Sequence, residues 1–235
     1  MELDRHILST YMKLRLWVGV IGIIFPFLLW VGGVIQGVPL QGSMSDYFHA
    51  NQTVGEYDTT PDDGVMRSWF VGILFVVGVT LILYKGFSNR ENWLLNIAGV
   101  LAVCVAIFPK EWNCDECAKI TIHGVCAISF FICIAIVCIW CASNTLHLLN
   151  ESDRVKYRRA YWLLGAGMIA SPLAAWLLTR DQKLSGSYIF FVEALGVCVF
   201  AIYWIVKSIE IYRSNADQDA LTKKIGPMNL INQNS

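Results

Sequence analysis

The sequence is poor in charged residues, which make up 15% of its 235 residues against about 25% in a typical soluble domain. Lys plus Arg and Asp plus Glu both number 18, so the formal net charge is zero. An intrinsically disordered chain is excluded, because disorder requires low hydrophobicity and high net charge, whereas 56% of these residues are hydrophobic. No basic stripe is present, so we expect no nucleic-acid binding.

The hydrophobic residues come in blocks of roughly 18 or more, the length that crosses a bilayer core. No small-x-small cleavage motif follows the first block, which we therefore expect to remain as a span. The third block is short and needs flanking residues, local thinning or a re-entrant path. We expect six spans: Leu16 to about Gln36, Met66–Tyr84, Trp93–Phe108, Ile120 to about Leu146, Ala160–Leu178 and Ser187–Val206.

These spans predict an all-α, multi-pass integral membrane protein with a six-helix transmembrane domain over residues 16–212. Most Lys and Arg residues lie in segment 1–15, in the second and fourth loops and in the tail. Since such loops stay cytoplasmic, both termini should be cytoplasmic, and loops 38–65, 109–119 and 179–186 should face outward. We expect the polar tail 213–235 to be disordered.

Three ionisable residues lie near the outward ends of the spans: Arg67, His123 and Glu193. Charged groups inside a membrane are costly and suggest function. We hypothesise that the three converge in a pocket for a lipid head group or a protein partner. The alternative is a structural cluster in which Arg67 pairs with Glu193 and holds two helices together.

A second candidate set lies in the long, acidic loop 38–65. On a helix, Ser45 and His49 would share a face, and with Asp46 they offer a nucleophile, an acid–base pair or metal ligands. His49 and His123, with a carboxylate from Asp46 or Glu193, could together hold zinc. The alternative is an ordinary turn or short helix at the membrane surface.

Cys114 and Cys117 form a C-x-x-C motif in the outward loop 109–119. With His123 this motif has half of the ligands of a zinc site, but no second cysteine pair stands at the usual spacing. Because cysteines outside the cytoplasm tend to oxidise, we favour a local disulfide between Cys114 and Cys117.

Several short motifs follow one another along the predicted spans: Gly42–Tyr47, Phe70–Gly72, Asn96–Gly99, Phe108–Pro109, Ile122–Gly124 and Phe191–Ala194. Their order resembles a bacterial family of six-span membrane proteins. More distantly, it is similar to the damage-regulated autophagy modulator family, which includes relatives in GPI-anchor remodelling and phosphoinositide regulation. The resemblance covers about residues 14–212 and implies association with lipids in a bacterial inner membrane, with Ser45, Asp46, His123 and Glu193 at family positions.

Ser45 and His49 also resemble the opening motif of ceramidase-like and adiponectin-receptor-like membrane hydrolases. Those enzymes hold zinc with three histidines, two of them as His-x-x-x-His in the last span. Here the histidines are His6, His49, His123 and His147, so no two lie four apart and the sixth span has none.

We favour a lipid-associated membrane protein with an outward polar pocket. One alternative is a metal-dependent hydrolase acting on lipid, with zinc as its cofactor. Another is a proton-coupled transporter or channel that uses Glu193 and His123. A homo-oligomer is a further hypothesis.

Overall fold

The computed structural model describes residues 2–50, 64–110, 121–180 and 187–222, and these residues contain helices and no strand. Four short elements accompany six long helices: the 3₁₀ helices η1 (Met44–Phe48) and η3 (Ala142–Leu148), the π-helical turn η2 (Val137–Cys141) and the helix α7 (Ala216–Leu221). The long helices are α1 (Glu2–Ile35), α2 (Val65–Leu83), α3 (Asn89–Ile107), α4 (Ile122–Ile136), α5 (Glu151–Arg180) and α6 (Tyr188–Ser214).

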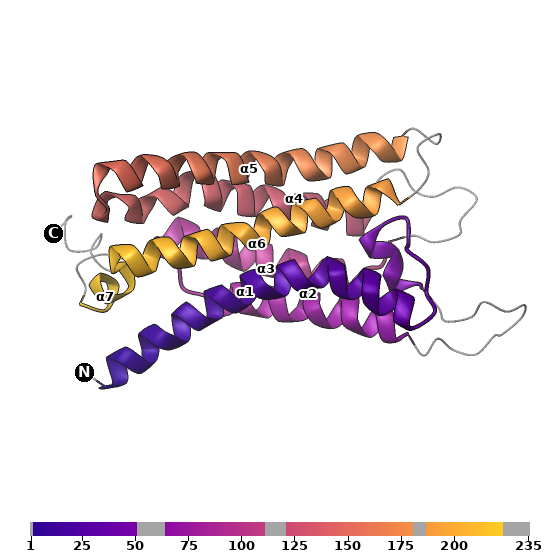
Figure 1. Ribbon diagram of the computed structural model, residues 1–235, viewed down its shortest axis with the longest axis horizontal. Helices are drawn as coiled ribbons and strands as arrows, with labels where there is room; N and C mark the ends of the chain where they lie inside the picture. Colours follow the sequence, from indigo (N-terminus) through magenta and orange to yellow (C-terminus); the bar gives the residue numbers. More distant parts are fainter. Residues whose placement is uncertain (1, 51–63, 111–120, 181–186, 223–235) are drawn as a thin grey trace, which may run out of the picture.

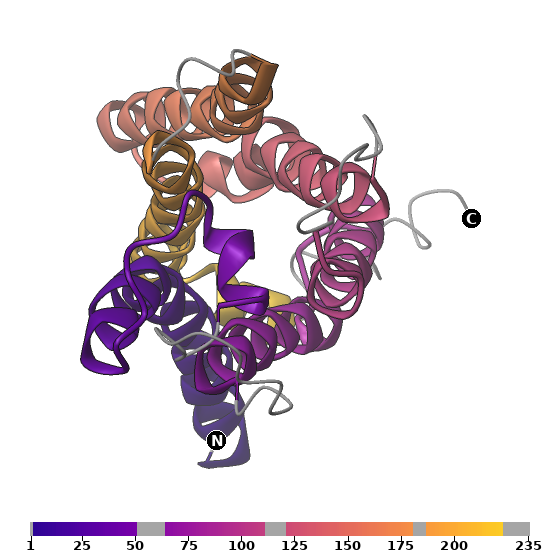
Figure 2. The ribbon, with the colours of Figure 1, turned by 90° about the vertical axis from the view of Figure 1, so that its right-hand side faces the viewer.

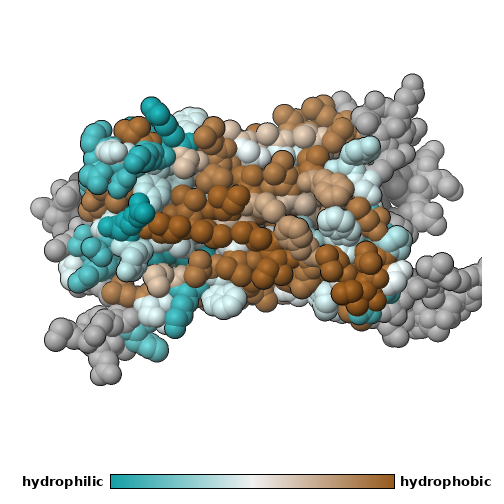
Figure 3. Space-filling view, in the orientation of Figure 1, coloured by the Kyte–Doolittle hydropathy of each residue, from teal (hydrophilic) through white to brown (hydrophobic). Residues whose placement is uncertain are grey.

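Within the described ranges, six helices are long and apolar enough to cross a membrane, with α4, η2 and η3 counted as one span over Ile122–Leu148. Apolar side chains cover the middle of the face shown in Figure 3, and hydrophilic residues gather at one end. For the described residues, the prediction of an all-α structure with six helices able to cross a membrane is therefore confirmed. The orientation of its termini relative to the cytoplasm stays a prediction.

The long helices run side by side along the length of the molecule (Figure 1) and surround a central region in the end view (Figure 2). The closest neighbours are α1 with α6, α2 with α3, α3 with α4, and α5 with both α4 and α6. We call the two ends of the bundle the η1 end and the α7 end. The start of α1 lies at the α7 end, and the loop containing η1 lies at the other.

The third span obtains its length from flanking residues. Its helix begins at Asn89 rather than at Trp93, because the Ser88 hydroxyl caps it by accepting a hydrogen bond from Glu91 N at 3.2 Å. The resulting 19 residues are about 28 Å long at 1.5 Å per residue. Local thinning or a re-entrant path is therefore not required.

Helices α1 and α6 extend beyond the first and sixth predicted spans. Residues 2–15, predicted as a separate N-terminal segment, continue α1, and α6 reaches Ser214. Asn215 adopts a left-handed conformation with φ 53°, which ends α6 and lets α7 turn back. Residues 216–221, expected in the disordered tail, are thus helical, while residues 223–235 lie outside the described residues.

Candidate functional site

The candidate site is built around η1, which lies inside the ring of long helices at one end of the bundle (Figure 2). Gly42 O accepts a hydrogen bond from Phe190 N at 2.9 Å, which ties the loop to the start of α6. The side chain of Tyr47 is fully buried beside Gly33, where an added Cβ would lie 2.9 Å from the tyrosine ring. Burial also raises the pKa of the Tyr47 phenol, so this residue acts as a neutral anchor.

Glu193 on α6 holds the beginning of η1. Its carboxylate accepts hydrogen bonds from the Ser43 hydroxyl at 2.9 Å and from Met44 N at 2.7 Å. The same Ser43 hydroxyl caps η1 by accepting a hydrogen bond from Ser45 N at 3.1 Å. Because these contacts fix the backbone on both sides of Met44, Glu193 determines where Ser45 points.

Ser45 points at His123, in the first turn of α4. The Ser45 Oγ and His123 Nε2 atoms are 2.8 Å apart, and His123 Nδ1 lies 2.9 Å from Phe108 O. A carbonyl oxygen can only accept, so Nδ1 carries the hydrogen and, in the neutral ring, Nε2 accepts from the Ser45 hydroxyl. Both side chains are buried, with 8% and 6% exposed.

A mostly apolar cavity of about 110 Å³ adjoins this pair. Ser45, His123 and Glu193 are the polar residues of its lining, and the apolar lining comes from Met44 of η1 and from α1, α2, α3, α4 and α6. Phe131 on α4 is a lining residue eight positions after His123, which is about 12 Å along a helix. The other apolar lining residues are Phe25, Phe70, Leu74, Ala102, Val105, Ala127, Phe130 and Val197.

Asp46 and His49 both contact the segment that follows α3. Asp46 Oδ1 forms an ion pair with Lys110 Nζ at 2.9 Å, and His49 Nε2 lies 2.8 Å from Lys110 O. Ser45 and His49 therefore do not act on one common partner, since Ser45 contacts α4 and His49 contacts Lys110. In this geometry, Asp46 and His49 tie η1 to the end of α3.

Arg67 on α2 holds the end of η1. Its Nε donates to Phe48 O at 2.9 Å, and its guanidinium lies 4.6 Å from the centre of the Phe48 ring. The structure thus brings Arg67, His123 and Glu193 to the same short element but to different points along it. Among the described residues, the hydrogen bonds of Glu193 go to Ser43 and Met44 and not to Arg67.

The proposed metal ligands are separately engaged. Within the described ranges, no group of three or more His, Cys, Asp or Glu side chains is placed to hold a metal ion. His49 and His123 each contact a backbone carbonyl of the segment after α3. Zinc binding stays a prediction, and Cys114 and Cys117 lie outside the described residues.

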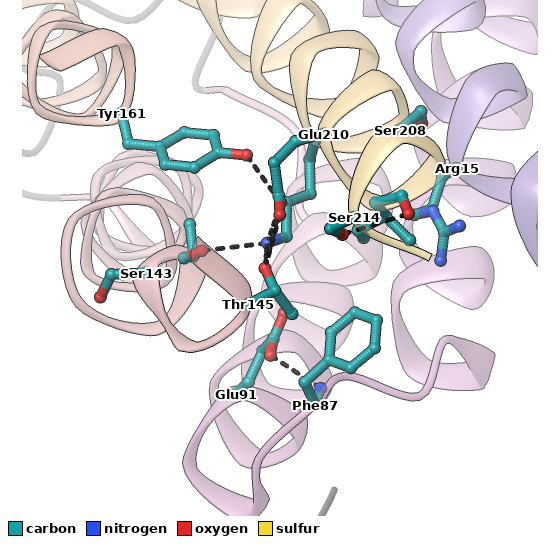
Figure 4. A network of polar contacts seen from close by, with 12 residues as sticks. Arg15, Phe87, Glu91, Ser143, Thr145, Tyr161, Ser208, Glu210 and Ser214 are labelled. Carbon is teal, nitrogen blue, oxygen red and sulfur yellow. Dashed lines mark hydrogen bonds and ion pairs between the residues drawn. The ribbon is translucent and has the colours of Figure 1, made fainter. Parts of the chain in front are cut away.

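A second polar cluster, at the α7 end, was not expected from the sequence (Figure 4). Lys207 on α6 donates from Nζ to Glu210 at 2.6 Å, to Thr145 Oγ1 at 2.7 Å and to Ala142 O at 3.0 Å. Glu210 also accepts from Thr145 and from Tyr161. Lys207 and Glu210 are almost inaccessible to solvent, so this cluster joins α5 and α6 to η3.

Two more buried charges complete the α7 end. Arg15 on α1 is 1% exposed and forms an ion pair with Asp217 on α7. Glu91 is 2% exposed and accepts from Phe87 N at 2.8 Å. In the sequence, Arg15 directly precedes the first predicted span and Lys207 directly follows the sixth, so nothing in their positions distinguishes them from ordinary charges at the membrane surface. The i,i+3 spacing of Lys207 and Glu210 at the end of an apolar run was the available signal.

Comparison of the chain with protein-family models, curated proteins and solved structures finds no match. The resemblance to bacterial six-span proteins and to the damage-regulated autophagy modulator family therefore stays a prediction.

Proposed function

We propose that the protein binds a membrane lipid at the η1 end, with an acyl chain in the cavity and the polar part at Ser45, His123 and Glu193. The observation that carries this proposal is the cavity itself, which combines an apolar lining with polar groups at one end. An amphiphile requires the same combination. The cavity, at about 110 Å³, is smaller than the apolar cavity of roughly 150 Å³ that binds benzene, so it has room for a short part of an acyl chain and not for a whole chain.

The charges around η1 support a role in positioning rather than in direct phosphate binding. Arg67 is engaged with Phe48 and is not among the residues that line the cavity. Lys110 is engaged with Asp46. The lipid group that reaches the polar end is thus better matched by an uncharged ester than by a phosphate.

The proposal places the lipid in the outward leaflet, because the η1 end is predicted to face outward. A location in a bacterial inner membrane rests on the sequence resemblance alone. The zinc hydrolase and the proton-coupled transporter stay predictions of the sequence.

Photocross-linking tests lipid binding. The protein, in lipid nanodiscs, would be irradiated with a phospholipid that carries a diazirine in its acyl chain, and cross-linked peptides would be mapped by mass spectrometry. We expect cross-links to cavity residues of α4 and α6 in the wild type. Replacing Ala127, which lines the cavity, by phenylalanine would fill the space and reduce these cross-links severalfold.

Ile128→Phe is the matched control, because Ile128 is the next residue of α4 and is 37% exposed on the bundle surface. It adds a similar ring without entering the cavity, so cavity cross-links should persist. Equal cross-linking of the wild type and both variants, at matched thermal stability, would show that lipid does not occupy the cavity.

A further inference from the structure

We propose that Ser45 is a nucleophile, activated by His123, that accepts the acyl group of a lipid ester bound in the cavity. This inference rests on the proposed lipid binding and adds a chemical reaction to it. It is carried by the arrangement of three groups: a hydroxyl, an imidazole within hydrogen-bond distance, and a carbonyl that orients the imidazole. This is the general geometry of an activated serine.

The hydrogen-bond directions suit proton transfer from Ser45. His123 Nδ1 donates to Phe108 O, which places the free lone pair of the neutral ring on Nε2, facing the Ser45 hydroxyl at 2.8 Å. Phe108 O thus takes the orienting role that a carboxylate has in a Ser-His-Asp triad. The Ser45 proton therefore has an acceptor already in place.

The position of the pair also favours chemistry over a purely structural hydrogen bond. Both Ser45 and His123 line the cavity, so the hydroxyl lies next to the space proposed for the acyl chain. A hydrogen bond that only joined η1 to α4 would not need this open volume. Glu193 acts as a positioning residue, because it holds the backbone that aims Ser45.

The reaction balances with water as the only co-reactant. Ser45 Oγ forms a bond to the acyl carbon and transfers its proton to His123 Nε2. The bond between the acyl carbon and the ester oxygen breaks, and the leaving alcohol takes that proton. Water then attacks the acyl-serine, giving a proton to Nε2 that returns to Ser45, and a fatty acid leaves.

An alkyl fluorophosphonate with a long chain tests the nucleophile directly. Attack by Ser45 on phosphorus would release fluoride and leave a stable phosphonyl group, which peptide mass spectrometry locates. We expect the full-length protein in nanodiscs to be labelled at Ser45. Because a general base contributes roughly 10²–10⁴-fold, His123→Gln should slow labelling by about 100-fold or more.

Ser68→Ala is the control variant, because Ser68 is an exposed serine of α2 near the same end of the bundle. It should be labelled at Ser45 at the wild-type rate, whereas Ser45→Ala should lose the label. The rate of hydrolysis of a fluorogenic long-chain acyl ester should rank the variants in the same way: unchanged in Ser68→Ala, slowed in His123→Gln and lost in Ser45→Ala. If His123→Gln left the rate of labelling at Ser45 unchanged, His123 would not be the base.

The wild-type result is decisive even if a variant fails to fold. Cross-linking of the diazirine lipid in the cavity, without phosphonylation of Ser45, would overturn the nucleophile and leave lipid binding intact. Phosphonylation of Ser45 without lipid cross-links would support a reactive serine and contradict the proposed lipid. Absence of both would overturn both proposals.

Discussion

Lys207 and Glu210 show at the residue scale how this protein accommodates charge inside the bundle. Both side chains are withdrawn from solvent, and Lys207 has three oxygen partners within 3.0 Å. Burial of a charge is costly unless it is paired and fully hydrogen-bonded. Two of these oxygens, Ala142 O and Thr145 Oγ1, belong to the 3₁₀ helix η3, which directly follows the π-helical turn η2.

We expect Lys207→Met to lower the free energy of unfolding by about 3–5 kcal/mol, because Glu210 would remain as a buried, uncompensated charge. The double variant Lys207→Met/Glu210→Gln should recover most of this loss, since glutamine is neutral and still accepts from Thr145 and Tyr161. Thermal unfolding in detergent, followed by tryptophan fluorescence, measures both effects.

Lys156→Met is the control for this pair. Lys156 is 74% exposed and lies 3.6 Å from Asp153, and exposed pairs contribute little. A double variant as unstable as Lys207→Met alone would mean that the lost lysine contacts, and not the unpaired carboxylate, cause the instability.

At the scale of the helix, two glycines determine how closely α2 and α3 approach each other. An added Cβ at Gly78 would lie 2.7 Å from Gly99 O, and one at Gly99 would lie 2.5 Å from Gly78 O. The backbones therefore touch directly, as small residues allow in membrane bundles. The sequence alone does not identify this pair of glycines, because spacing within one helix does not reveal the neighbouring helix.

Gly99→Ala should destabilise the protein by about 1–3 kcal/mol, because the methyl group forces the two backbones apart. Gly72→Ala is the matched control on α2, since no atom lies within 4 Å of its added Cβ. At position 72, replacing glycine by alanine inside a helix should leave the free energy of unfolding unchanged or raise it by roughly 0.5–1 kcal/mol. The midpoint of thermal unfolding in detergent would measure both variants, and equal destabilisation would contradict the close α2–α3 contact.

The ends of the elements were harder to predict than their existence. The span Trp93–Phe108 was identified from its apolar residues, but its helix starts at Asn89 through the Ser88 cap. Glu91 is polar by type yet buried, because its carboxylate accepts from Phe87 N. A capping contact of this kind extends a helix beyond the apolar run that reveals it.

The predicted orientation of the whole molecule rests on the distribution of Lys and Arg and is directly testable. Green fluorescent protein fused to the C-terminus should fluoresce in a bacterial host, because it folds in the cytoplasm. Alkaline phosphatase fused after Gly37 should be active, because it requires the outward compartment. An active phosphatase at the C-terminus would reverse the predicted topology and place the η1 end in the cytoplasm.

The sequence by itself predicted six helices able to cross a membrane and their approximate limits, because blocks of about 18 or more apolar residues have the length that crosses a bilayer core. It also singled out His123 and Glu193, since ionisable residues inside a membrane are costly, and Ser45, since it would share a helix face with His49. These inferences need only local composition and position along the chain.

Only the tertiary structure decided which of these side chains meet. The Ser45–His123 contact joins residues 78 positions apart, and the Glu193–Ser43 contact joins residues 150 apart. Helix order and the folding of η1 into the bundle create these contacts, and neither is written in the periodicity of any one span. For the same reason, Lys207 and Glu210 became a buried pair only once η3 packed against α6.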